Sequence, residues 1–113
     1  MPFIDAKITG TLTPEKREAV KAEFGKAISL LNKSETYLMV GFTDNCDLYM
    51  AGKQLQRGAY VAVSLFGSAS SDAYERMTAK ICSILERELS IPGDAVYVTY
   101  HGVSDWGWNG RNF

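Results

Sequence analysis

The feature that most restricts the fold of this chain is a strand–helix–strand pattern that occurs twice, over residues 2–42 and again over 59–100. Each half begins with a β-rich segment, continues through a capped helix and returns by a short loop to another strand. Crossovers between parallel strands are right-handed, so both helices should cover the same face of one sheet. The sequence therefore predicts an α/β (α+β) fold: a duplicated β-α-β unit with a four-stranded mixed sheet and two helices on one face.

The two helices are marked by capping signals and by apolar spacing. Thr13-Pro14-Glu15 predicts the start of the first, with Thr13 as the cap, proline at the first helical position and an acidic residue near the positive end of the helix dipole. Ser71 or Asp72 caps the second, and Asp72 and Glu75 have capping-box spacing if Asp72 is the cap. The predicted buried faces are Val20, Phe24, Ala27, Ile28 and Leu31 in the first helix, and Tyr74, Met77, Ile81, Ile84 and Leu85 in the second.

The predicted strands cover residues 2–8, 37–42, 59–66 and 95–100, with a shorter one at 48–50. The 37–42 segment is apolar on both faces, which predicts a buried strand. Asn32 is suited to the end of the first helix because asparagine tolerates the left-handed conformation. Residues 52–58 form a polar loop, and Asn109-Gly110 in the tail predicts a tight hairpin or turn.

Two helices can cover only one face of the predicted sheet. The strands at 38–42 and 59–65 carry apolar residues in both registers, so the second face would leave a large apolar surface open to water. Such a surface is unusual on a monomer of this size. We therefore expect one domain, spanning residues 1–113, that associates with copies of itself, most naturally in a closed ring.

Composition narrows the classes of function. The formal net charge is -1, and lysine and arginine are spread along the chain, which argues against a nucleic-acid partner. Cys46 and Cys82 are too few and too far apart for a disulfide framework or a zinc site. Asp5 and Lys7 interrupt any apolar run at the amino terminus, so we expect no signal peptide, and no segment approaches the length of a membrane span. A reduced, cytoplasmic protein is the simplest interpretation.

Pro2 is the candidate reactive residue. Removal of the initiator methionine, usual before a small residue, would make Pro2 a free secondary amine at the start of a strand. Such a ring amine is a rigid base, and burial or a neighbouring cation would lower its pKa towards the working pH. The simpler interpretation is that Pro2 only begins a strand, a position where its missing N–H is tolerated.

Several segments, in order and spacing, resemble the macrophage migration inhibitory factor family of the tautomerase superfamily. They are Pro2-Phe3-Ile4, Asn32-Lys33 before Tyr37-Leu38-Met39-Val40, Val96-Tyr97-Val98 and Trp106-Gly107-Trp108-Asn109-Gly110. The resemblance covers essentially the whole chain. It implies a homotrimer whose active sites lie between subunits. It also implies cofactor-independent keto–enol tautomerisation of α-keto acids such as phenylpyruvate, and of dopachrome-like compounds, with no metal.

The resemblance also implies roles for individual residues. Pro2 is the general base, Lys33 binds the substrate carboxylate and helps to keep the proline neutral, and the backbone N–H of Phe66 holds the same carboxylate. The aromatic positions around the pocket mouth are Tyr37, Tyr97, Trp108 and Phe113, with Tyr97 supplied by the neighbouring subunit. Thr99 replaces an asparagine and Phe66 an isoleucine, so both should alter the choice of substrate.

Other interpretations remain open at this point. The chain could be a cytokine-like binding protein that keeps the pocket without depending on turnover, with a receptor that the sequence does not identify. It could also be an unrelated ligand-binding α/β sandwich, which a stable monomer would support. His101, the only histidine, matches no catalytic position of the family, and we expect it on the surface or in a trimer channel. The family's Cys-x-x-Cys pair is replaced by Gly58-Ala59-Tyr60-Val61, which argues against a redox function.

Overall fold

The computed structural model describes residues 1–113 and contains the predicted four-stranded sheet. Its order is β2 (Met39–Thr43), β1 (Pro2–Ile8), β5 (Ala59–Phe66) and β6 (Val96–Val103). β1 is parallel to β2 and β5 is parallel to β6, while β1 and β5, at the centre, are antiparallel. The duplicated β-α-β pattern and the mixed sheet are therefore confirmed.

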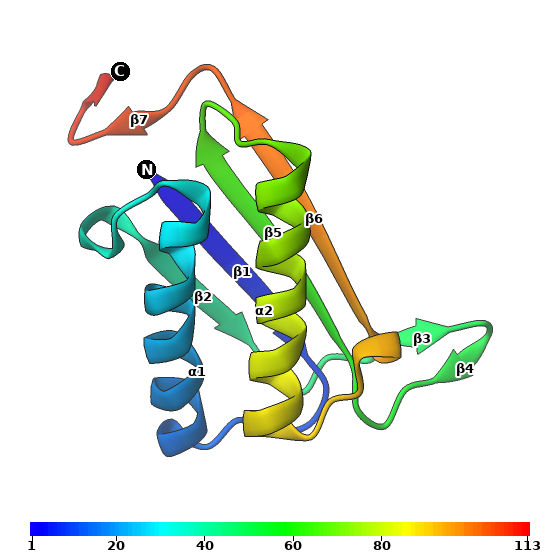
Figure 1. Ribbon diagram of the computed structural model, residues 1–113. Helices are drawn as coiled ribbons and strands as arrows, with labels where there is room; N and C mark the ends of the chain where they lie inside the picture. Colours follow the sequence, from blue (N-terminus) through cyan, green and yellow to red (C-terminus); the bar gives the residue numbers. More distant parts are fainter.

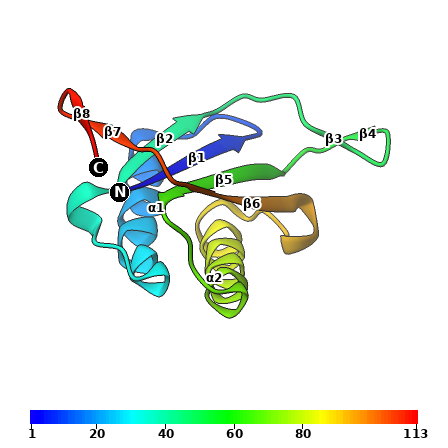
Figure 2. The ribbon, with the colours of Figure 1, turned by 90° about the horizontal axis from the view of Figure 1, so that it is seen from above.

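Helices α1 (Pro14–Ala27) and α2 (Ser71–Leu89) lie side by side on the same face of the sheet. Figure 2 shows both of them on one side and the other side of the sheet uncovered. The core forms between the two layers, and the predicted helical faces supply much of it. Its largest fully buried side chains include Phe24, Ile28, Leu31, Met77, Ile81, Ile84 and Leu85 from the helical layer and Ile4, Ile8 and Leu65 from the strands.

The start of α1 is as predicted, whereas the start of α2 is not. Thr13 Oγ1 accepts a hydrogen bond from the Lys16 N–H at 3.2 Å, with Pro14 as the first helical residue. The cap of α2 is one or two residues earlier than predicted, because Ser70 is extended and its hydroxyl accepts from the Ala73 N–H at 3.1 Å. Asp72 therefore lies inside the first turn, and the predicted capping box with Glu75 does not form.

After α1 the chain tightens into a short 3-10 helix, η1 (Ile28–Leu31), which ends at Asn32 in the left-handed conformation, as predicted. The strand predicted over 37–42 is shorter and less buried than expected. Tyr37 belongs to a second 3-10 turn, η2 (Glu35–Tyr37), where the Ser34 hydroxyl accepts from the Thr36 N–H. β2 lies at the edge of the sheet, with a neighbouring strand on one side only, and Met39 is 68% exposed.

Two hairpins extend from the central sheet. β3 (Tyr49–Met50) pairs with β4 (Lys53–Gln54), which lies within the segment predicted as a polar loop. β7 (Gly107–Trp108) pairs with β8 (Arg111–Asn112) around Asn109-Gly110, which confirms the predicted hairpin. The first hairpin projects from the end of the molecule opposite the amino terminus, whereas the second lies beside it (Figure 1). A 3-10 turn, η3 (Gly93–Ala95), precedes β6, so the last strand of the four-stranded sheet starts at residue 96 and runs on to residue 103.

The uncovered sheet face is more polar than the sequence suggested. Buried and less buried residues alternate along β1 and β5, so one set faces the helices and the other faces outward. The outward set on β1 contains Asp5 and Lys7, and on β5 it contains Ser64 as well as apolar residues. Neither helix combines the length and the apolar character needed to cross a lipid bilayer.

Candidate active site

A mostly apolar cleft of about 360 Å³ opens at the amino terminus. Three segments that are distant in sequence line it: Met1–Phe3 at the start of β1, residues 36–39 between η2 and β2, and residues 106–108 at the tail. Figure 1 shows these segments together at one end of the molecule. The sheet order brings them together, because β1 lies next to β2 and the tail returns over the same end after β6.

Pro2 is buried at the head of β1, opposite Leu65 of the neighbouring β5. Its ring occupies the first position of the strand, where no N–H is needed for the ladder. The ladder continues one residue upstream, because the Phe66 N–H donates to the Met1 carbonyl oxygen at 3.0 Å. The Phe66 donor therefore points at the group that precedes Pro2 in the chain.

Lys33 brings a positive charge to the same place. It follows the left-handed Asn32 at the end of η1, and its Nζ donates to the Phe66 carbonyl oxygen at 2.8 Å. Burial, and secondly the nearby Lys33 ammonium, lower the pKa of the Met1 α-amino group below its usual value. Both effects disfavour a second positive charge at this end of β1.

Four of the predicted aromatic residues meet beside the cleft. The ring centroids of Tyr37 and Trp108 are 5.8 Å apart with the rings nearly perpendicular. Trp108 stacks on Phe113 at 6.3 Å, and Phe113 contacts Phe66 at 5.8 Å. These spacings are typical of stabilising aromatic pairs. The rings of Tyr37, Trp108 and Phe113 remain about half exposed, so they form an apolar rim that solutes can reach.

Tyr97 and Thr99 do not join the cleft of their own chain. Tyr97 of β6 pairs with Tyr60 of β5, and Tyr60 pairs with Lys7 of β1. Lys7 is five residues after Pro2, so Tyr97 is displaced by about 17 Å from Pro2 along the strand direction, at ~3.4 Å per residue. Tyr97 is 66% exposed on the outward face. Thr99, on the same face, has its hydroxyl 2.8 Å from the Tyr60 hydroxyl and 2.9 Å from His101 Nε2.

Three of the residues that line the cleft were predicted as site residues: Pro2, Tyr37 and Trp108. The other seven were not: Met1, Phe3, Thr36, Leu38, Met39, Trp106 and Gly107. Trp106 is the only residue of the tail 104–113 that is not exposed, and its carbonyl oxygen accepts the Phe113 N–H at 3.1 Å. A second tryptophan two positions before Trp108 was the available signal, since alternate residues of an extended segment face the same side.

A larger hollow of about 550 Å³ lies at the base of the β3–β4 hairpin, away from the amino terminus. Its lining is mostly polar and includes Asp47 but no lysine or arginine. This hollow shares no lining residue with the cleft at Pro2, and neither Pro2 nor Lys33 borders it, so the cleft at Pro2 remains the candidate site.

The duplicated β-α-β fold, with a cleft at the start of its first strand, agrees with the expectation from the resemblance to the tautomerase superfamily. A sequence model described as macrophage migration inhibitory factor (MIF) matches residues 1–113. The chain belongs to this family.

Solved structures agree with this assignment. MIF2 of Leishmania major is 31% identical with a TM-score of 0.93, over 100% of this chain and 97% of that one. The macrophage migration inhibitory factor of Toxoplasma gondii is 24% identical with a TM-score of 0.91, over 98% and 99%. A fused 4-OT protein, solved as a symmetric trimer, shares the fold at 17% identity and a TM-score of 0.85, over 97% and 94%. A comparison with curated proteins finds no match.

Proposed function

We propose that the protein is a cofactor-independent keto–enol tautomerase of phenylpyruvate-like α-keto acids, with dopachrome-like compounds as further substrates. The supporting observation is the convergence of a backbone donor and a cation on the residue that precedes Pro2. The Phe66 N–H reaches the Met1 carbonyl oxygen, and Lys33 acts electrostatically on the Met1 amine. Removal of Met1 frees both the donor and the space that Met1 occupied in the cleft.

In this mechanism the Pro2 nitrogen is the general base. Burial and the Lys33 ammonium, which lower the pKa of the Met1 amine, would likewise favour the neutral form of the Pro2 amine, and this form can accept a proton. The substrate carboxylate replaces the Met1 carbonyl at the Phe66 N–H and is neutralised by the Lys33 ammonium. The proline nitrogen then moves a proton between the carbon next to the carbonyl and the carbonyl oxygen, through an enolate whose negative charge the same cation stabilises.

We further propose that the active form is a homotrimer. Tyr97 and Thr99 are too far from Pro2 within one chain, so they reach the site only from a neighbouring chain packed against the outward sheet face. A trimeric relative with this fold supports such an arrangement. The apolar rim formed by Tyr37, Trp108 and Phe113 would then hold the apolar end of the substrate.

The test is the conversion of the enol form of phenylpyruvate to the keto form. Protein whose intact mass shows loss of Met1 is compared with Pro2→Gly processed in the same way, which keeps an amine but loses the rigid ring. We expect a large loss of kcat/KM for Pro2→Gly. Equal rates would end the proposal. The cytokine-like binding alternative predicts a different result: a purified trimer that converts no α-keto acid but captures a specific partner.

A further inference from the structure

The turn of the β7–β8 hairpin combines an asparagine with a following glycine. Both residues are exposed, and both have positive φ, 53° at Asn109 and 81° at Gly110. The Asn109 side-chain amide makes no hydrogen bond within the protein. The two strands of the hairpin form only two residue pairs, Gly107 with Asn112 and Trp108 with Arg111. A hairpin this small is only marginally stable in water, so its turn samples other conformations.

We propose that Asn109 is a site of spontaneous deamidation. The backbone nitrogen of Gly110 attacks the side-chain carbonyl carbon of Asn109, a C–N bond forms, and ammonia leaves. Water then opens the five-membered imide at either carbonyl, which leaves aspartate or isoaspartate in the chain. The step consumes one water, releases one ammonia and needs neither an oxidant nor a cofactor. Aspartate adds one negative charge, and isoaspartate also adds a methylene group to the backbone.

The other asparagines are internal comparators. Asn32 and Asn45 have nearly the same backbone conformation as Asn109, with φ of 58° and 55°. They precede Lys33 and Cys46, and Asn112 precedes Phe113, so each is followed by a side chain that hinders the attack of its own backbone nitrogen. Asn109 alone is followed by glycine. If the glycine controls the reaction, the modification will be confined to Asn109.

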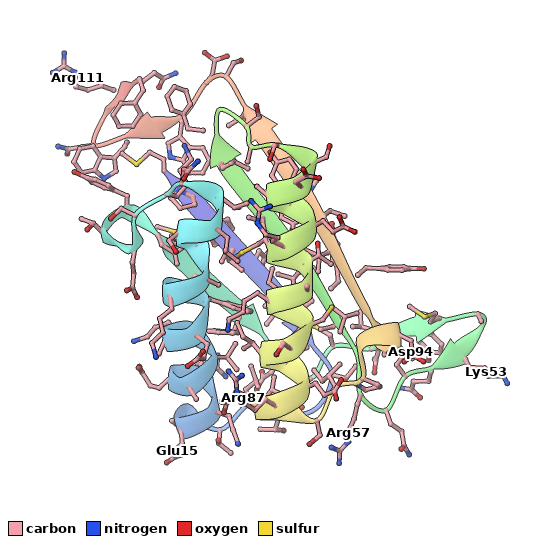
Figure 3. All side chains as sticks on the ribbon, viewed as in Figure 1. Glu15, Lys53, Arg57, Arg87, Asp94 and Arg111 are labelled. Carbon is pink, nitrogen blue, oxygen red and sulfur yellow. The ribbon has the colours of Figure 1, made fainter.

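The modified turn would change the wall of the candidate site. The hairpin carries Trp108, and no backbone hydrogen bond joins residues 106–113 to the rest of the protein. Ring contacts from Trp108 to Tyr37 and from Phe113 to Phe66 hold it in place instead. Figure 3 shows Arg111, just after the turn, extending outward from the molecule. An altered turn therefore has few constraints to resist it, and the aromatic wall loosens.

The experiment ages the processed full-length protein at mildly alkaline pH and follows each asparagine by peptide mass mapping. Asn109→Gly is the matched control, because a Gly-Gly pair still suits this turn but has no amide to lose. Both tryptophans lie in the tail, so their emission reports on this segment alone. We expect modification at Asn109 only, and a rise in acrylamide quenching of tryptophan in the aged wild type but not in Asn109→Gly.

An unmodified Asn109, or equal modification at Asn45, would overturn the proposal. Modification with unchanged quenching would overturn its effect on the wall. The deamidation does not depend on the proposed tautomerase activity; only its effect on turnover rests on it. When turnover of the aged protein is measured, kcat/KM for phenylpyruvate should fall in proportion to the fraction of protein modified at Asn109. Absence of turnover in fresh protein would count against the proposed function while leaving the mass and quenching results decisive for the modification.

Discussion

Replacement of Lys33 by methionine tests the electrostatics of the candidate site most directly. Methionine keeps an unbranched, flexible side chain but lacks the ammonium group, whose Nζ donates to the Phe66 carbonyl oxygen at 2.8 Å. Two effects follow from one substitution. The substrate carboxylate loses its ionic partner, and the Pro2 amine loses a neighbouring cation, so the pKa of that amine rises. Because the base works in its neutral form, the acid limb of the activity profile moves to higher pH.

The size of the first effect follows from the kind of bond that is lost. A hydrogen bond to a charged group contributes about 1.5–3 kcal/mol, and each ~1.4 kcal/mol is a factor of ten. We therefore expect kcat/KM for phenylpyruvate to fall by about 10- to 150-fold in Lys33→Met. Since the carboxylate is bound in both the ground state and the transition state, much of the loss should appear in KM.

The assay is the pH dependence of kcat/KM for wild type, Lys33→Met and a charge control, Lys26→Met. Lys26 lies in the last turn of α1, and its side chain is 73% exposed. Its replacement removes the same charge away from the cleft and should leave both kcat/KM and the profile unchanged. Unchanged kcat/KM in Lys33→Met, or an equal loss in both variants, would refute the electrostatic reasoning.

Three further predictions concern stability. Gly102→Ala should cost about 1–3 kcal/mol in chemical denaturation, because the new Cβ meets the backbone carbonyl oxygen of Gly67, which cannot turn aside. Gly25→Ala should instead raise the free energy of unfolding by up to about 1 kcal/mol, since only the mobile carboxylate of Glu35 is in the way and α1 gains a better helix former. Burial raises the pKa of the Tyr100 hydroxyl in the folded protein above its value in the unfolded chain. The neutral hydroxyl therefore contributes its full stabilisation below about pH 10, and this contribution is lost as the pH rises through the pKa of the folded protein. Tyr100→Phe, which lacks two hydrogen bonds to α2, should be less stable by about 1 kcal/mol at neutral pH, yet should lose less stability in alkaline titrations followed by circular dichroism.

Much of the fold could be predicted because its signals are local. The Thr13 cap, the left-handed Asn32 and the Asn109-Gly110 turn each depend on a few neighbouring residues, and all three are confirmed. The start of α2 was predicted one or two residues late, because three residues in a row could cap it. The backbone conformation that selects Ser70 is set by the loop leading out of β5, which local spacing does not describe.

The burial of β2 and the existence of β4 could not be read from sequence for a different reason. An apolar run such as 37–42 predicts a strand but not its place in the sheet, and β2 proves to be an edge strand. β4 consists of Lys53 and Gln54, which have no apolar alternation and pair only because a turn brings them back to β3.

In the candidate site, too, some features could be predicted from the sequence and others could not. Pro2, Lys33 and Phe66 lie together because each stands at the end of an element that reaches the same end of the sheet, whereas their roles stay predictions. Trp106 was missed because the path of an irregular tail is not encoded in a periodic pattern. Tyr97 belongs to the site only if a second chain supplies it, so its role stays a prediction.

The place of β1 inside the sheet is what would make a chain terminus usable as a reactive group. Terminal residues are ordinarily poorly ordered unless they are tied down. Here Pro2 is buried between two strands, and the ring fixes the direction of its nitrogen. The same ladder places the Met1 carbonyl on the Phe66 N–H, so an unprocessed chain satisfies with its own backbone the donor that a substrate carboxylate would need. Removal of one residue would therefore create the base and its anion donor in a single step, and neither would work in a chain that keeps Met1.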